Sequence, residues 1–177
     1  MERTARRCSC DRLCSMDIAY RKLTPHDLMA MWRINEEGLP GVGEISQEAL
    51  ADLLSLCELA LGAYHEDSLA GFVLCLLPGT RYGSPNYAWF NARHEAFLYV
   101  DRIAVSEASR DRGIGAGLYE RVIAHAEQRR WPVAAEVNLR PPNPGSMRFH
   151  ERHRFSRSGV LEHGSKAVAM LLRPPTE

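Results

Sequence analysis

A glycine-rich turn between an apolar run and a predicted helix is the part of the sequence best suited to bind a phosphate group. The turn reads Arg110-Asp-Arg-Gly-Ile-Gly-Ala-Gly117. Glycines let backbone N–H groups come close to phosphate oxygens, and the start of a helix adds a favourable potential for an anion. Arg110 and Arg112 add positive charge that can pair with phosphate oxygens. We therefore expect a phosphate or pyrophosphate to bind at this turn.

Three phosphate-binding patterns can be compared with this turn. A P-loop requires a Lys after its second glycine, and the segment contains none. The dinucleotide fingerprint Gly-x-Gly-x-x-Gly fits Gly113 and Gly115, but Leu118 takes the place of the third glycine. The pattern Arg/Gln-x-x-Gly-x-Gly/Ala is matched at every fixed position, beginning with Arg110. The sequence supports this third pattern.

At these positions the sequence resembles the GNAT superfamily of acyl-CoA-dependent N-acyltransferases. A second segment supports the resemblance, because Asn143-Pro-Gly-Ser-Met-Arg-Phe-His-Glu-Arg-His-Arg-Phe155 is similar to the family's Asn-Pro-x-Ser-x-x-Phe-Tyr-x-x-x-Gly-Phe. The run Phe-His-Glu-Arg-His is also similar to a bacterial subgroup described only as predicted acetyltransferases. The resemblance follows the order of elements over residues 18–172 and is motif-specific over 98–155.

The resemblance implies an α/β fold, with a mixed, mostly antiparallel sheet of about six to seven strands flanked by about four helices. It implies acetyl-CoA as co-substrate and direct transfer of its acetyl group to a primary amine of a small molecule or a protein. Two alternatives stay open: a non-catalytic acyl-CoA-binding or regulatory domain, and a transferase that uses another acyl-CoA. A homodimer is one assembly to consider.

The resemblance also assigns residues to the acyl-CoA. The strand ending in Ile103, Ala104 and Val105 is expected to splay from its neighbour and to give backbone contacts to the pantetheine arm and the acyl carbonyl. Three residues of the later segment are expected beside this arm, two as polar contacts and one by packing: Asn143, Ser146 and Phe149. The residues expected around the pyrophosphate are Arg110, Asp111, Arg112, Gly113, Ile114, Gly115, Ala116 and Gly117.

Direct transfer needs a base for the amine proton and a proton source for the departing thiolate. Asp101 and Glu136, on two neighbouring predicted strands, are the candidate bases. Each has a structural alternative, an ion pair with a residue such as Arg102 or Arg140. His150 falls where the family places its thiolate-protonating Tyr, so we expect it to give the sulfur a proton or a hydrogen bond. Its structural alternative is an imidazole at the surface or the edge of the core.

The hydrophobic pattern predicts the elements that position these residues. Strands are expected over 18–23, 59–64, 69–77, 96–105, 133–139, 156–162 and 167–172, and helices over 24–35, from Ser46 to Leu54, from the glycine-rich turn to Gln128, and up to His153. The segment 78–93 is predicted to be a long loop that forms the acceptor wall together with the first two helices. Arg154 replaces the family's glycine, a residue that ends the preceding helix with a positive φ.

The composition excludes several classes of protein. With 177 residues, 45% of them apolar, the chain suits one domain over 16–177 after a disordered N-terminal extension over 1–15. The 22 basic and 22 acidic residues cancel, which argues against nucleic-acid binding. No run reaches the roughly 18 apolar residues that a membrane span needs, so no membrane partner is expected.

The five cysteines indicate a reducing compartment, because their number is odd and Cys57 and Cys75 lie in apolar runs. We therefore expect a cytoplasmic protein. Cys8, Cys10 and Cys14 form a denser cluster, which is either three zinc ligands or part of an unstructured tail. A fourth ligand at the usual spacing is missing, so no metal is predicted.

Overall fold

The computed structural model describes residues 17–176. The predicted N-terminal extension and the cluster of Cys8, Cys10 and Cys14 lie outside this range. The elements follow one another as β1 (Ile18–Lys22), η1 (Pro25–Asp27), α1 (Leu28–Glu37), α2 (Gln47–Leu56), β2 (Leu59–His65), β3 (Ser68–Leu76), α3 (Pro85–Asn91), β4 (Leu98–Val105), η2 (Glu107–Ser109), α4 (Ile114–Glu127), β5 (Val133–Arg140), α5 (Pro144–Arg152), β6 (Ser156–His163) and β7 (Lys166–Arg173).

The strands form one mixed sheet in the order β1-β2-β3-β4-β5-β7-β6. Every neighbouring pair is antiparallel except β4 and β5, which run parallel. The predicted α/β fold with a mostly antiparallel sheet is thereby confirmed. The topology also leaves the single parallel pair in the middle of the sheet, where the chain crosses over through α4.

The predicted long loop over 78–93 is wrong, because it contains the helix α3 and raises the number of helices from four to five within 17–176. Ser84 caps this helix by accepting a hydrogen bond from the amide of Tyr87, and Pro85 occupies its first position. Tyr87 and Phe90 are fully buried against the sheet. The segment therefore contributes to the core as well as to the surface.

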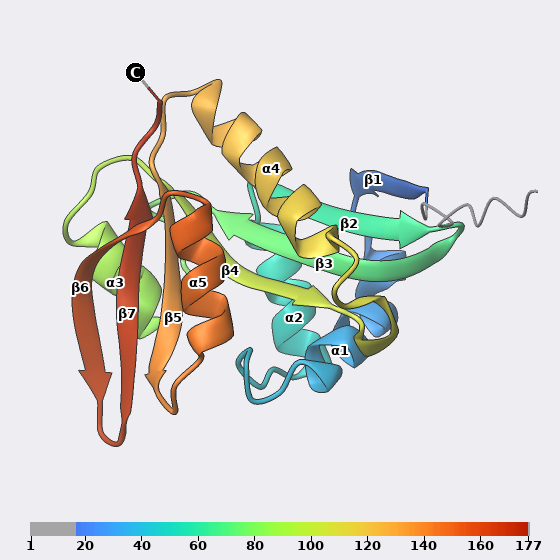
Figure 1. The fold of residues 1–177 in the computed structure, drawn as a ribbon, viewed down its shortest axis with the longest axis horizontal. Coiled ribbons are helices and arrows are strands. Elements are labelled where there is room, and N and C mark those ends of the chain that lie inside the picture. The colour runs from blue at the N-terminus through green and yellow to red at the C-terminus, as the bar shows by residue number, and fades with distance from the viewer. Residues whose placement is uncertain (1–16, 177) are drawn as a thin grey trace, which may run out of the picture.

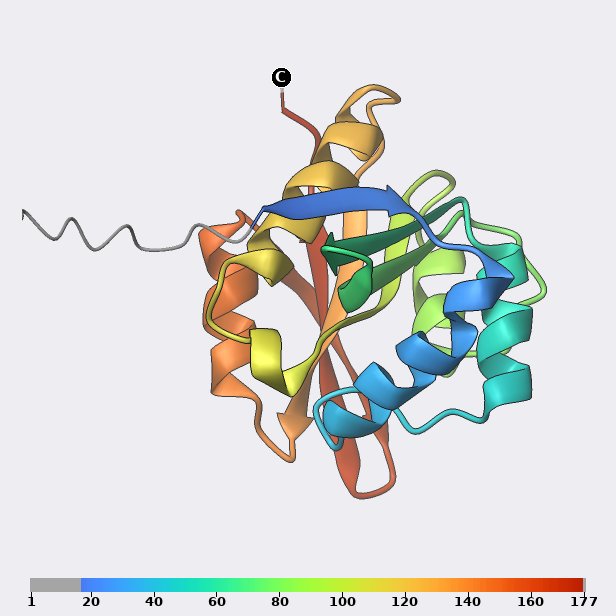
Figure 2. The ribbon, with the colours of Figure 1, turned by 90° about the vertical axis from the view of Figure 1, so that its right-hand side faces the viewer.

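The sheet separates two helical layers, which Figure 2 shows edge-on: α1, α2 and α3 lie on one side, and α4 and α5 on the other. Successive side chains of a strand point to opposite faces. Along β3, Phe72 and Leu74 accordingly pack toward α1–α3, whereas Val73 and Cys75 pack toward α4 and α5. All four side chains have no exposed surface. The central strands are thus buried on both faces.

The strands β4 and β5 pair only at their starts. Their ladder contains the pairs Leu98–Val133 and Tyr99–Ala134 and ends there. Beyond this point the two strands diverge, as Figure 1 shows by the directions of their arrows. The remainder of β4 therefore has an edge that faces β5 without being paired to it.

A β-bulge coincides with the point of divergence. On β3, the consecutive residues Leu74 and Cys75 pair with Arg102 and Val100 of β4, so that Asp101 is the extra residue. A bulge bends its strand and increases the local twist. The bulge at Asp101 is therefore the local reason why β4 turns away from β5.

Candidate active site

A cavity of about 1070 Å³ occupies the opening between β4 and β5. The unpaired part of β4 from Val100 to Val105 and the facing part of β5 from Ala135 to Asn138 form its walls. The loop over 37–44, between α1 and α2, closes a further side. The cavity has the size expected for a cofactor or substrate site in an enzyme.

The edge of β4 presents two backbone amides toward this cavity. The amide of Ser106 donates to the carbonyl oxygen of Ala70 on β3 at 2.8 Å. Backbone groups of successive strand residues alternate between the two edges, so those of Ala104 also face β3. The backbone groups of Ile103 and Val105 then face β5, at positions beyond the end of the β4–β5 ladder. Ala104, also predicted to bind the cofactor, lines the cavity but has its backbone in the β3 ladder.

The predicted phosphate-binding turn has the backbone of an anion site. Asp111 and Gly113 adopt left-handed conformations with φ of 60° and 78°, and α4 begins directly after them. Among the described residues, no side chain caps the helix start. The amides of Ile114, Gly115 and Ala116 belong to the first turn, where amides have no partner within a helix. The turn therefore offers several convergent donors, which a phosphate group can accept.

The three glycines of this turn meet different requirements. Gly113 is needed for its positive φ and not for space, because a Cβ there would meet no heavy atom within 4 Å. Gly115 has room for a side chain, since its nearest neighbour is the Val105 side chain at 4.0 Å. Gly117 packs against Tyr20, and a Cβ at that position would overlap the tyrosine hydroxyl. Gly117 thus has a packing role rather than a direct role in an anion site.

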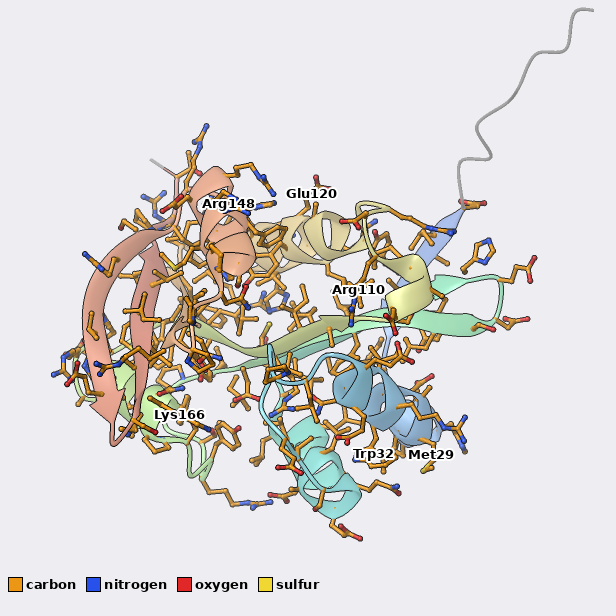
Figure 3. All side chains as sticks on the ribbon, turned by 60° about the horizontal axis from the view of Figure 1, so that its bottom comes forward. Met29, Trp32, Arg110, Glu120, Arg148 and Lys166 are labelled. Atoms are coloured by element: carbon orange, nitrogen blue, oxygen red, sulfur yellow. The ribbon has the colours of Figure 1, made fainter. Side chains whose placement is uncertain are left out.

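Arg110 connects the turn to the cavity. Its guanidinium Nη2 donates to the carbonyl oxygen of Glu37 at the end of α1, at 2.7 Å. Figure 3 shows Arg110 on the turn before α4, on the side that faces α1. The Glu37 carboxylate in turn accepts from the amide of Glu107 at 2.7 Å. Of the predicted turn residues, Arg110 lines the cavity, and those from Asp111 to Gly117, Arg112 included, are not in its lining.

Glu136 lies in the cavity wall. One oxygen of its carboxylate accepts two hydrogen bonds, and the other accepts none from the residues that the structure describes. Its Oε1 accepts from Tyr99 Oη at 2.9 Å and from Asn86 Nδ2 at 3.1 Å. Its Oε2 is buried and has no hydrogen-bond partner within residues 17–176. Burial, followed by the nearby charge of Asp101, raises the pKa of Glu136 to about 8. The group therefore keeps its proton at low pH, and its carboxylate form, which can accept a proton, grows as the pH rises toward 8.

Asp101 is held in the ion pair that the sequence analysis gave as its structural alternative. Its side chain is 4% exposed, and its Oδ2 lies 3.1 Å from Nε of Arg102. Arg102 also donates through Nη1 to the side chain of Asn35 and to the carbonyl oxygen of Gly43. The guanidinium therefore ties β4 to α1 and to the loop that closes the cavity. The other proposed partner, Arg140, pairs with Glu162 instead.

His150 is buried at the opposite wall, with a partner on each ring nitrogen. Its side chain belongs to α5 and lines the cavity, although the residue is only 4% exposed. Nδ1 lies 2.8 Å from the carbonyl oxygen of Ser146, and Nε2 lies 2.6 Å from the hydroxyl of Tyr119. Burial lowers the pKa of His150. Tyr119 was not predicted, since in the sequence it reads as one more residue of the buried face of α4.

The remaining predicted residues cluster at the start of α5. Asn143 caps this helix by accepting from the amide of Ser146 at 3.0 Å, and both side chains line the cavity. Phe149 is not in the cavity lining and packs edge-on against Tyr119, with ring centroids 5.0 Å apart. Arg154, after the helix, has a φ of 65°, so this position does require the left-handed backbone that the sequence comparison implied.

The far end of the cavity is built by residues that sequence reasoning did not single out. Tyr82 and Ser84 line it from the segment before α3, and His163 and Lys166 line it from the β6–β7 hairpin. Figure 3 shows Lys166 well separated from Arg110, at the other side of the molecule. Of the segments predicted to form the acceptor wall, the 37–44 loop and the segment around the start of α3 line the cavity, and the β6–β7 hairpin lines it as well.

Neither a metal site nor a membrane span is visible in the part of the chain that the structure describes. Among residues 17–176 no three His, Cys, Asp or Glu side chains are grouped so that they could hold a metal ion. Within the same range, none of the helices combines the length and apolar character that crossing a membrane requires.

Comparisons with known proteins agree with the geometry. Residues 28–155 match the sequence profile of the acetyltransferase (GNAT) family. Ard1 from Thermoplasma volcanium superposes with a TM-score of 0.73 at 19% identity, covering 90% of this chain and 99% of that one. The ribosomal-protein-S18-alanine N-acetyltransferase of Escherichia coli gives 0.70 at 16% identity, covering 90% and 95%.

Arabidopsis thaliana NAA60, solved with a bisubstrate analogue, gives a TM-score of 0.72 at 17% identity and covers 90% of this chain and 98% of that one. Comparison with curated proteins returned no match to this sequence. The structural likenesses establish the shared fold, and the profile match spans well over half of the sequence. The chain belongs to the acetyltransferase (GNAT) family.

Proposed function

We propose that the protein is an acetyl-CoA-dependent N-acetyltransferase that moves the acetyl group directly to a primary amine of a small molecule or a protein. The observation that carries this proposal is the opening between β4 and β5, where unpaired backbone amides stand beside a buried, basic carboxylate. One wall of the opening can hold an extended acyl thioester, and the other can deprotonate an amine. Family membership supports the choice of acetyl-CoA.

The residues present fit acetyl-CoA, which would supply an activated acetyl group as its thioester. The pantetheine arm is an extended chain with amide groups, which the free backbone groups of Ile103 and Val105 can pair with as a strand would. Asn143 and Ser146 offer polar side chains on the other wall. The amides at the start of α4 suit the pyrophosphate, with Arg110 between the turn and the cavity.

Glu136 is the better of the two candidate bases. Its Oε2 is buried without a partner among the described residues, so an ammonium group would satisfy it. Because its pKa is about 8, the carboxylate form that takes a proton from the amine is partly populated near neutral pH and grows as the pH rises toward 8. Asp101 is already paired with Arg102 and contributes its negative charge instead. A free amide on the edge of β4, such as that of Ile103, can polarise the acetyl carbonyl during attack.

The candidate base for the amine and the groups near the expected thiolate lie on opposite faces of the sheet. Glu136 bonds to Asn86 of α3, in the layer of α1–α3. His150 and Tyr119 lie in the layer of α4 and α5. Because the cavity passes through the opening of the sheet, an amine can approach from the first layer while the thiolate leaves toward the second. This arrangement suits a direct displacement without an acyl-enzyme intermediate.

The proposal names the acceptor only by its class, a primary amine. One structural neighbour is named for acetylating an alanine of a ribosomal protein, and this keeps protein amino groups among the acceptors of the proposal. Small amines are equally compatible with a cavity of about 1070 Å³.

The experiment is a thiol-release assay with acetyl-CoA and a panel of small amines and peptides. We expect release that depends on the amine, and a loss of about 10²–10⁴-fold in kcat for Glu136→Gln. Glu120→Gln is the matched control, because Glu120 is exposed on α4. Acyl-CoA binding with no amine-dependent release would favour a non-catalytic acyl-CoA-binding domain. Thiol release with a longer acyl-CoA but not with acetyl-CoA would identify that longer acyl-CoA as the donor.

A further inference from the structure

The hydroxyl of Tyr119 and the imidazole of His150 form a short hydrogen bond at the edge of the cavity. The two atoms are 2.6 Å apart, although the residues come from α4 and α5 and are 31 positions apart in the chain. Tyr119 is 1% exposed and His150 is 4% exposed, and both line the cavity. Two buried polar groups that meet at the wall of a reaction site call for a chemical explanation.

The direction of this hydrogen bond follows from the other partner of His150. The carbonyl oxygen of Ser146 can only accept, so Nδ1 of His150 carries the hydrogen at that 2.8 Å contact. In a neutral imidazole Nε2 is then an acceptor, and the Tyr119 hydroxyl must donate to it. Neither side chain has a hydrogen left for a third group in this state.

Protonation of His150 reverses the bond. An imidazolium donates through both nitrogens, so Nε2–H would point at the Tyr119 oxygen. The hydrogen of the hydroxyl is then free to turn toward the cavity. The pair therefore has two states, and only the protonated one presents an O–H donor to a molecule in the cavity.

Aromatic side chains pack around the pair on the sides away from the cavity. Phe149 and Phe155 pack edge-on against Tyr119, and Phe155 also packs against His150, with ring centroids between 5.0 and 5.8 Å apart. The other titratable groups that act on the pair are few. His153, which directly follows α5, opposes a positive charge on His150, and Cys75 and Glu136 oppose ionisation of Tyr119.

We propose that Tyr119 donates the proton to the departing thiolate. His150 is the positioning residue, and it replaces the proton that Tyr119 gives away. This inference rests on the proposed acetyl transfer. As the amine nitrogen bonds to the acetyl carbon, the carbon–sulfur bond breaks and sulfur keeps the electron pair. The hydroxyl proton of Tyr119 moves to sulfur, and the tyrosine oxygen takes the Nε2 proton of protonated His150. His150 regains a proton from solvent, which receives the two protons that an ammonium acceptor loses.

The first test measures turnover of Tyr119→Phe, His150→Phe and the double variant with an amine that the wild type acetylates. Each single variant should lose about 10²-fold in kcat or more, with CoA affinity changed by less than about threefold. The double variant should lose no more than the worse single one, because the two groups act as a unit. Tyr64→Phe is the matched control, since Tyr64 is a buried tyrosine on β2 outside the cavity lining.

Wild-type turnover in Tyr119→Phe would overturn the proposal, whatever His150→Phe shows. Losses that multiply in the double variant would also overturn it, because they would mean that the two side chains act separately.

The second test needs no acceptor and no turnover. The ultraviolet absorbance of the thiolate gives the pKa of the thiol of bound CoA. This pKa is lowered if the thiol proton can pass to His150 while the thiolate accepts a hydrogen bond from Tyr119. We expect this pKa to rise by about one unit or more in Tyr119→Phe relative to the wild type and Tyr64→Phe. Equal values in all three proteins would overturn the proposal. A clear difference without any acetyl transfer would instead refute the proposed function and leave the contact between Tyr119 and sulfur in place.

A third measurement uses the wild-type protein alone and is independent of how the variants fold. In ¹⁵N NMR spectra, Nε2 of His150 should have the shift of an acceptor nitrogen in the free protein. Binding of CoA should change that shift, and binding of desulfo-CoA, which lacks the sulfur, should not. The same Nε2 shift with both ligands would contradict the proposed contact.

Discussion

Replacing Glu136 by glutamine should stabilise the protein at alkaline pH while it removes activity. Glu136 has a pKa of 4.5 when unperturbed and about 8 in the folded protein. Between these values the folded state keeps the proton that the unfolded state has lost, so the stability of the wild type falls as the pH rises. Below pH 4.5 the carboxyl is neutral in both states and this loss is absent.

The size of the effect follows from the shift in pKa. The rise from 4.5 to about 8 corresponds to roughly 5 kcal/mol at pH 9, and is an upper bound. Glu136 as a whole residue is half-buried and lines a cavity open to solvent, which screens part of the charge, so we expect about 2–4 kcal/mol. The side-chain amide introduced by Glu136→Gln keeps an oxygen that can accept from Tyr99 and Asn86, so these contacts should survive the substitution.

The assay is urea unfolding of the wild type, Glu136→Gln and the control Glu120→Gln at several pH values from about 5 to about 9, which span the pKa of Glu136. The advantage of Glu136→Gln over the wild type should be small at the acidic end and grow steadily toward the alkaline end. Glu120→Gln should follow the wild type throughout. An advantage of Glu136→Gln that is the same at both ends would refute the reasoning, because the buried charge would then not be the cause.

Three further substitutions test other parts of the structure. Arg102→Met should lower the free energy of unfolding by about 3–5 kcal/mol, because it leaves the Asp101 carboxylate buried and unpaired. Chemical denaturation measures this change, and a value below about 1 kcal/mol would contradict the role of the ion pair. Arg154→Gly should raise the unfolding free energy by about 0.5–1 kcal/mol, since it relieves a φ of 65°, and a lower melting temperature would speak against it. Gly113→Val should abolish CoA binding in calorimetry, because a β-branched residue cannot adopt the φ of 78° that orients the amides of the turn. Unchanged affinity in a folded variant would mean that the phosphate groups bind at another place.

The sequence predicts the backbone part of the site better than the side-chain part. The turn of Gly113 and Gly115 and the strand that ends at Val105 are local features, so their residue types determine them directly. The order of strands and helices follows from periodicity in the same way. The helix α3 escaped prediction because it has only seven residues, although Ser84 and Pro85 are a recognisable helix start.

The chemistry of the side chains depends on packing between distant elements. The contact between Tyr119 and His150 is set by how α4 lies against α5, which no spacing in the sequence encodes. The raised pKa of Glu136 comes from its burial and from the bulge that holds Asp101 nearby. The sequence predicts Asp101, Glu136 and His150 as candidates but not Tyr119, and the protonation and partners of all four follow from the tertiary structure.

Acetyl transfer itself is tested most directly by following both products of one reaction. The purified protein is incubated with acetyl-CoA and an amine, and free CoA and acetylated amine are measured over time by mass spectrometry. The proposed direct transfer predicts that the two products form in equal amounts, and that both are lost in Glu136→Gln, a variant that should still fold. Release of CoA without acetylated amine, or tight binding of acetyl-CoA with neither product for any amine, would contradict it.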